Sequence, residues 1–382
     1  MTSILFFVGL YLLCHLYAVA NHLSESPLAI SLLKEKQRWL KIHNQESCRD
    51  KNNVVIWLTY HKATDEIAAL IAGDKHLKGA RVAGNNISSV CDFDVGKYTS
   101  VLGPDSHYQT LMSEHSFLIV MGLLIEDFYP GKAFVGTCSW KSSRKGRPIP
   151  CQRFRTYNSS KFESFGGHAA VYWGPKAGPL ISLDAMQRNV AKLQPSNENQ
   201  MGLIINKFFR EVFHTDEGMD PSGWAIVPPS GPALLWSNYF MTSPKVWAIL
   251  AKFDFVVASW LDVTYPSTSL SNLTCPSTYK HLGDIGHLST HDVDSECRYC
   301  RSRVWTNWHR CRVGCHRCWS YVMEQLNVIF FSTLITRYYV NDDSACGTGG
   351  LEIPPTATAF SEKFSFHHIE KLYEDLIRNV PV

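Results

Sequence analysis

The chain has 382 residues, of which 45% are hydrophobic and 19% charged, and its formal net charge is +3 at pH 7. This composition is typical of a globular protein with enough apolar residues for a buried core, and it excludes a disordered chain. Because the small positive excess is spread along the sequence, it gives no electrostatic reason to expect a nucleic acid as partner. The length suits one large α/β domain or two modest ones.

The first twenty residues have the character of a targeting segment. Residues 4–20 are uncharged and apolar but short for a membrane span, and they end in Ala18-Val19-Ala20, the small-x-small pattern of a signal-peptidase site. We therefore expect residues 1–20 to be a cleaved signal peptide, with a short signal anchor as the alternative. Contact with a membrane is expected only if this segment stays uncleaved.

Two further features agree with export. The chain contains twelve cysteines, a number that is ordinary where disulfides form. It also carries three N-glycosylation acceptors, at Asn86, Asn158 and Asn272. We expect the protein in the lumen of the secretory pathway, in the ER or Golgi, or outside the cell.

The elements that follow predict an α/β fold. Residues 21–52 are expected to form a helical stem, whose helix begins at Ser26 and Pro27. A first core strand is predicted over 54–60, because a continuous apolar run is typical of a strand buried on both faces. An amphipathic helix is expected from about Thr64. In an open α/β sheet of this kind, ligands bind beyond the carboxyl ends of the strands.

The middle and the end of the chain continue the alternation of helices and strands. A long, mostly buried helix is predicted over 108–128 and a second core strand over 133–139. A helix capped by Ser243 is expected to begin at Pro244 and to reach about Leu261. The other predicted elements are helices at 183–193, 200–214, 316–340 and 365–379, and a strand at 232–242.

A polar, cysteine-rich insertion interrupts this pattern at residues 262–314. The predicted divisions are therefore an α/β domain at 53–261, the insertion, and a helical completion of the domain at 315–382. The cysteine pairs Cys297–Cys300 and Cys315–Cys318 are separated by fourteen residues, a spacing that suits a structural zinc site. In an oxidising lumen the same residues more often pair as disulfides, so we favour disulfides and keep zinc as the alternative.

Several short motifs follow one another along the α/β part of the chain. In order they are Thr59-Tyr60-His61-Lys62 at a strand end, Asn86-Ile87-Ser88, Glu114 at the start of a helix, Phe134 to Lys141 in a strand and its turn, Asn238 to Ser243, and Arg317 with Glu324 seven residues later.

This ordered set over residues 53–335 resembles a family of GT-A-type glycosyltransferases found in bacterial capsular-polysaccharide gene clusters and in some eukaryotes. The resemblance implies a GT-A-like open mixed sheet flanked by helices. It also implies transfer of a hexose from a nucleotide sugar to a glycan or glycoprotein acceptor. The turn after the second core strand departs from the family: it reads Ser-Trp-Lys-Ser-Ser-Arg where the family has His-Tyr-Arg-Arg. The alternative function is therefore a non-catalytic, secreted carbohydrate-binding or interaction protein on the same fold.

Sugar transfer requires neutralisation of the leaving diphosphate, and cationic side chains or a metal held by carboxylates provide it. The candidates for the nucleotide-sugar site are His61, Lys62, Lys141, Arg144 and Asn238. The alternative for the basic residues is an ordinary solvated turn without a binding role.

The catalytic candidates are two glutamates. Glu114 begins a helix, where its ordinary role is to complement the helix dipole. Glu324 lies inside an apolar helix, so it is either paired with Arg317, two turns earlier, or a catalytic base. The carboxylates of Asp92 and Asp94 form an Asp-x-Asp pattern that suits Mn²⁺ or Mg²⁺, although the basic turn also permits a metal-independent reaction.

Overall fold

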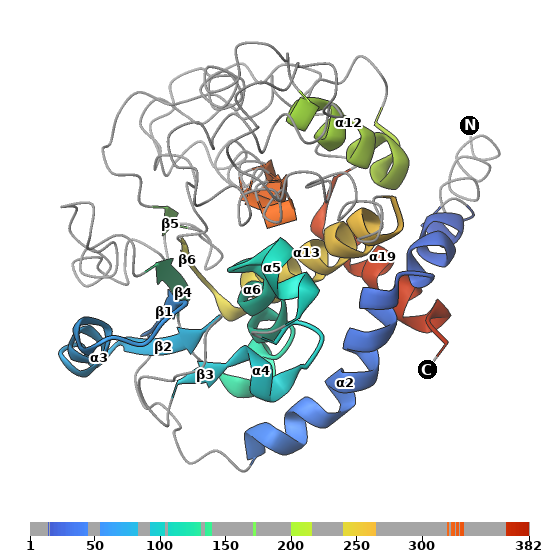
Figure 1. The fold of residues 1–382 in the computed structure, drawn as a ribbon. Coiled ribbons are helices and arrows are strands. Elements are labelled where there is room, and N and C mark those ends of the chain that lie inside the picture. The colour runs from blue at the N-terminus through green and yellow to red at the C-terminus, as the bar shows by residue number, and fades with distance from the viewer. Residues whose placement is uncertain are drawn as a thin grey trace, which may run out of the picture.

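A mixed sheet flanked by helices organises the computed structural model of the chain (Figure 1). The structure describes residues 14, 16–44, 54–82, 92–103, 106–130, 134–139, 171–172, 200–215, 240–264, 319–320, 322–324, 326–327, 329–331 and 364–381. Within this part of the chain the sheet has six strands in the order β3-β2-β1-β4-β6-β5. Their bounds are Val54–Tyr60 for β1, Leu77–Arg81 for β2, Phe93–Asp94 for β3, Phe134–Ser139 for β4, Val171–Tyr172 for β5 and Phe240–Thr242 for β6.

The first four strands of the sheet are parallel. β1 pairs with β2 on one side and with β4 on the other, and β3 extends the sheet beyond β2. β6 is antiparallel to both β4 and β5. The α/β class and the mixed character expected from the sequence are therefore confirmed.

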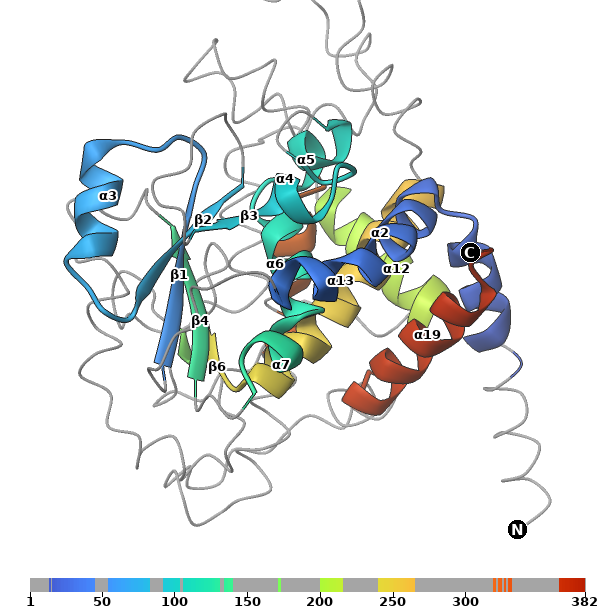
Figure 2. The ribbon, with the colours of Figure 1, turned by 90° about the horizontal axis from the view of Figure 1, so that it is seen from below.

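Helix α3 (Asp65–Ala72) covers one face of the sheet, and the other helices lie on the opposite face (Figure 2). α3 begins where the sequence predicts, because the side chain of Thr64 accepts a hydrogen bond from the backbone N–H of Ile67. On the face of the sheet that α3 covers, Ile56, Leu58 and Tyr60 of β1 are buried in a small hydrophobic cluster. The alternate β1 residues point into a much larger cluster on the other face, as the period of a strand requires.

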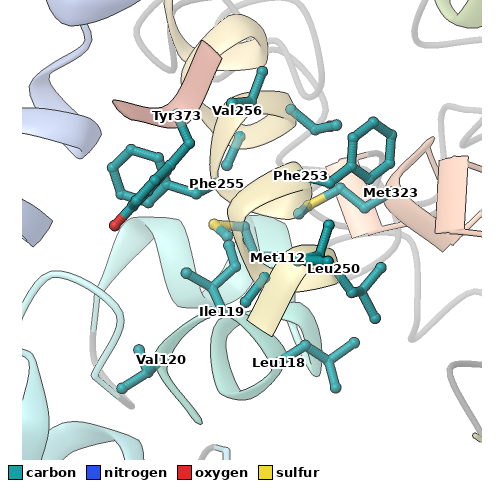
Figure 3. Close-up of a cluster of buried hydrophobic side chains, with 14 of the residues drawn as sticks. Met112, Leu118, Ile119, Val120, Leu250, Phe253, Phe255, Val256, Met323 and Tyr373 are labelled. Atoms are coloured by element: carbon teal, nitrogen blue, oxygen red, sulfur yellow. The ribbon is translucent and has the colours of Figure 1, made fainter. Parts of the chain in front are cut away.

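Two helices dominate the larger cluster. They are α6 (His115–Gly122), which is buried along its whole length, and α13 (Pro244–Thr264), which begins at Pro244 and is capped by Ser243, as predicted. Figure 3 shows Met323 beside Phe253 and Tyr373 beside Phe255, so residues from the C-terminal part of the chain pack on α13. The most C-terminal helix described, α19 (Phe366–Asn379), also packs on α13 and agrees with the predicted helix at 365–379.

The single helix predicted over 108–128 is wrong. The structure has three short helices there, α5 (His107–Met112), α6, and α7 (Ile125–Phe128). The first break lies at Ser113, whose φ of 54° is incompatible with a right-handed helix. The chain therefore changes direction just before α6, and Glu114 becomes the residue that precedes that helix.

Helix α2 (Pro27–Asn44) coincides with the helix expected in the segment 21–52, and it packs directly on α13. The carboxylate of Asp262 accepts hydrogen bonds from the Ser26 hydroxyl at 2.8 Å and from the Leu28 backbone N–H at 3.0 Å. Among the described helices, none combines the length and the apolar character that crossing a membrane requires. The division of the chain into segments stays a prediction.

The remaining predicted elements are only partly described. α12 (Gln200–Phe213) confirms the helix expected at 200–214, and β6 occupies the end of the strand expected at 232–242. The described residues between 319 and 331 are helical, within the helix expected at 316–340. α13 extends to Thr264, so the first three residues assigned to the insertion belong to this helix. The rest of the insertion and the helix expected at 183–193 lie outside the described residues.

Candidate functional site

The parallel strands bring several predicted site residues to one edge of the sheet. Tyr60 at the end of β1 is paired with Arg81 at the end of β2, which in turn is paired with Asp94 at the end of β3. His61 and Lys62 follow β1 directly. The carboxyl edge of the sheet is therefore lined by ionisable side chains from neighbouring strands, at the edge where open α/β sheets bind ligands.

His61 meets Glu114 at this edge. The imidazole Nε2 of His61 lies 4.0 Å from the carboxylate Oε1 of Glu114, and the two side chains are 18% and 15% exposed. Glu114 occupies the N-cap position of α6, but its side chain makes no capping hydrogen bond, so the carboxylate does not close the helix end. Two residues that the sequence nominated separately thus form one partly buried acid–base pair.

Lys62 follows His61 directly in the chain and is exposed. Among the residues that the structure describes, it forms no ion pair. An exposed ammonium group at a strand end can meet an anionic ligand without first breaking a salt bridge, which suits the phosphate role expected for it.

Asp92 and Asp94 are held by protein groups. The hydroxyl of Tyr60 donates to Asp92 Oδ2 at 2.6 Å, and the carboxylate of Asp92 lies directly over Gly79, where a Cβ atom would be only 2.3 Å from its Oδ1. Asp94 pairs with Arg81 and also accepts from the backbone N–H of Gly96 at 2.9 Å. Both carboxylates therefore tie together the ends of the first three strands.

The hydrogen bond from the backbone N–H of Gly96 makes Asp94 the N-cap of the short helix α4 (Val95–Tyr98). In the part of the chain that is described, no group of three or more His, Cys, Asp or Glu side chains is arranged to hold a metal ion. Binding of Mn²⁺ or Mg²⁺ by Asp92 and Asp94 stays a prediction.

A buried polar group that includes His115, the residue after Glu114, was not predicted from the sequence. His115, Asp254 and Asn327 are 1%, 0% and 2% exposed and come from α6, α13 and the helical residues near 327. Asp254 Oδ2 lies 3.5 Å from His115 Nδ1 and accepts from the Asn327 amide at 3.4 Å. Burial raises the pKa of the Asp254 carboxyl, and the contacts with His115 and Asn327 oppose that rise.

A signal for Asp254 was present in the sequence. It is a lone carboxylate in the apolar segment Phe253-Asp254-Phe255-Val256-Val257 of α13, the same pattern that singled out Glu324. Its partners could not be read from the sequence, because they lie 139 and 73 positions away.

Among the remaining candidates, only Glu324 lies within the described residues. Glu324 is helical and half-buried, one turn before Asn327. The partner expected for it, Arg317, lies outside the described residues. So do the remaining nucleotide-side and cysteine candidates, namely Lys141, Arg144, Asn238, Cys297, Cys300, Cys315 and Cys318.

No protein-family model, no curated protein and no solved structure matches this chain.

Proposed function

We propose that this protein is a glycosyltransferase that moves a hexose from a nucleotide sugar to a glycan or glycoprotein acceptor. The observation that carries the proposal is the pairing of His61 with Glu114, at 4.0 Å, on the carboxyl edge of a parallel sheet. The motif resemblance singles out both residues, which are distant in sequence. A GT-A-like domain is part of the proposal, and the observed mixed sheet is compatible with it.

Each residue has a definite task in this proposal. Lys62, together with Lys141 and Arg144, neutralises the charge that develops on the leaving diphosphate. Glu114 accepts the proton of the acceptor hydroxyl as the new glycosidic bond forms, and His61, beside Glu114, binds the donor from the nucleotide side. Asn238 binds a sugar hydroxyl, and Glu324 is kept as the second candidate base. In this proposal the basic side chains take the place of a metal ion, since Asp92 and Asp94 already bind protein groups.

An oxidising compartment is also part of the proposal. Cys138, which is fully buried near the end of β4, is disulfide-bonded. Disulfides persist in the secretory pathway and are rare in the cytosol, so this bond supports the proposed location in the lumen or outside the cell. Whether the paired cysteines around the insertion form disulfides or bind zinc stays a prediction.

The direct test is a thermal-shift measurement on the purified protein. UDP, GDP, ADP, CMP and their common sugar conjugates are each added with and without Mn²⁺. A ligand that binds only the native state raises the melting temperature by mass action, about 2.7 kcal/mol of added stability at a hundredfold excess over Kd. We expect one nucleotide family to raise the melting temperature, and the Mn²⁺ arm tests the prediction for Asp92 and Asp94.

The sheet offers a matched pair of control variants. His61→Ala removes an imidazole from the carboxyl edge, and His76→Ala removes one from the amino edge, where His76 precedes β2 and approaches the carbonyl of Val54. We expect His61→Ala to abolish the nucleotide-dependent shift and His76→Ala to preserve it. Binding of glycans without binding of any nucleotide contradicts the transferase and supports the non-catalytic alternative.

A further inference from the structure

The buried group of His115, Asp254 and Asn327 joins three separate helices. His115 and Asp254 share their helices with Leu118 and Phe253, two members of the buried apolar cluster in Figure 3. The second oxygen of Asp254, Oδ1, has no hydrogen-bond partner among the described residues. A buried carboxylate with an unsatisfied oxygen costs free energy, and replacement of such groups by apolar ones is often neutral or stabilising. Stability alone therefore does not account for Asp254.

The position of His115 in the chain suggests another role for Asp254. His115 is the first residue of α6 and follows Glu114 directly, just after the left-handed turn at Ser113. The Glu114 carbonyl accepts from the backbone N–H groups of Phe117 and Leu118 at 3.1 and 3.2 Å, so Glu114 is fixed to the first turn of the helix. Whatever fixes this turn also sets where the Glu114 carboxylate lies.

α13 holds α6 at both ends. At the start of α6, His115 meets Asp254 at 3.5 Å. Further along, the indole N–H of Trp247 donates to the carbonyl of Leu118 at 3.1 Å, and Gly122 packs against Trp247. The latter contacts lie further along α6 than His115. The contact between His115 and Asp254 links the start of α6 to α13, next to the residue that faces His61.

We propose that Asp254 is a positioning residue: by holding His115 it fixes the first turn of α6, and thereby the distance between Glu114 and His61 at the carboxyl edge of the sheet. The geometric part of this proposal stands without the transferase. Its meaning for catalysis rests on the function proposed above.

The test reads the surroundings of His61 directly, without a ligand. Protein carrying ¹³C-labelled histidine gives a ring signal for each imidazole, and the signal that disappears in His61→Ala belongs to His61. Glu114→Gln removes the charge beside His61 and so sets the direction and size of the expected change. We expect Asp254→Ala to move the His61 signal in the same direction as Glu114→Gln.

Two further variants distinguish positioning from a general loss of stability. Asp262→Asn changes a second buried carboxylate of α13, which accepts from the hydroxyls of Ser26 and Tyr108, and we expect the His61 signal to stay in place. Asp254→Asn keeps an oxygen that can accept from His115, so we expect it to restore the signal towards the wild-type position. If Asp254→Ala does not fold, His115→Phe removes the same contact by changing the other partner, and it should also move the His61 signal.

The proposal is overturned if the His61 signal in Asp254→Ala or His115→Phe coincides with that of the wild type, or if Asp262→Asn moves it as far. The role of Asp254 in the proposed transferase is tested separately, by measuring the affinity for UDP or for whichever nucleoside diphosphate raises the melting temperature. We expect weaker binding in Asp254→Ala and unchanged binding in Asp262→Asn. If no nucleotide binds the wild type, the transferase fails while the His61 signal still decides the positioning role.

Discussion

Substitution of Gly122 by alanine tests the contact between α6 and α13, on which the position of Glu114 depends. A Cβ atom at Gly122 would lie 2.4 Å from the Cβ of Ala251 and 2.6 Å from Cδ1 of Trp247. Ordinary contacts between carbon atoms are about 3.5–4.0 Å, so the helices must separate by roughly 1 Å. Overpacking of this kind costs about 1–3 kcal/mol, and the better helix propensity of alanine returns up to about 1 kcal/mol. We expect a net loss of about 1–2 kcal/mol in the free energy of unfolding.

Urea denaturation followed by circular dichroism measures this loss. The matched control is Gly73→Ala at the end of α3, where the new Cβ meets only the Ala69 and Leu70 carbonyl oxygens, at 3.1 and 3.8 Å, and where a change within about 0.5 kcal/mol is expected. The double variant Gly122→Ala/Ala251→Gly removes one of the clashing atoms and should recover part of the loss. A Gly122→Ala protein that is as stable as the wild type would refute the close approach of the two helices.

Other predictions concern single polar groups. Because burial raises the pKa of Asp254 above 3.8, the native state binds this proton more tightly than the unfolded chain does. The stability that the group contributes is therefore present below pH 3.8 and lost as the pH rises through the folded pKa. In urea titrations over this pH range, the wild type should lose stability relative to Asp254→Asn. A stability difference between the two proteins that does not change with pH contradicts this. Tyr60→Phe removes the donor to the buried carboxylate of Asp92 and should cost about 1–3 kcal/mol in the same assay, whereas an unchanged midpoint would exclude the contact. Ser365→Ala removes the cap of α19, a bond to the His368 N–H, and should cost about 1 kcal/mol; no loss would show that the cap does not contribute.

The sequence predicts the elements that have a strong local pattern. The apolar runs of β1 and β4 and the capped start of α13 are examples, because their signals lie within a few residues. β2 was not predicted, since Leu-Lys-Gly-Ala-Arg has no strand-like run, and its pairing with β1 is what makes it a strand. The break at Ser113 contains neither glycine nor proline, so only the packing of α6 reveals it.

In the candidate site, too, local patterns were predictable from the sequence and contacts between distant residues were not. His61 and Glu114 were nominated from motifs at predicted element ends, where one sequence can suggest a function. Their contact depends on how α6 packs against the sheet, and the sequence pattern contains no information about that packing. Asp254 was detectable as an isolated carboxylate in an apolar helix, but its task depends on His115 from another helix.

The most direct measurement is a titration of the histidine-labelled protein with UDP, GDP, ADP and CMP, followed through the ring signals of His61 and His76. These two imidazoles lie at opposite edges of the same sheet, so one spectrum reports on both edges. We expect one nucleotide to move the His61 signal in a saturable way and to leave the His76 signal unchanged. If none of them moves the His61 signal, or if both signals move equally, a nucleotide site at the carboxyl edge is contradicted.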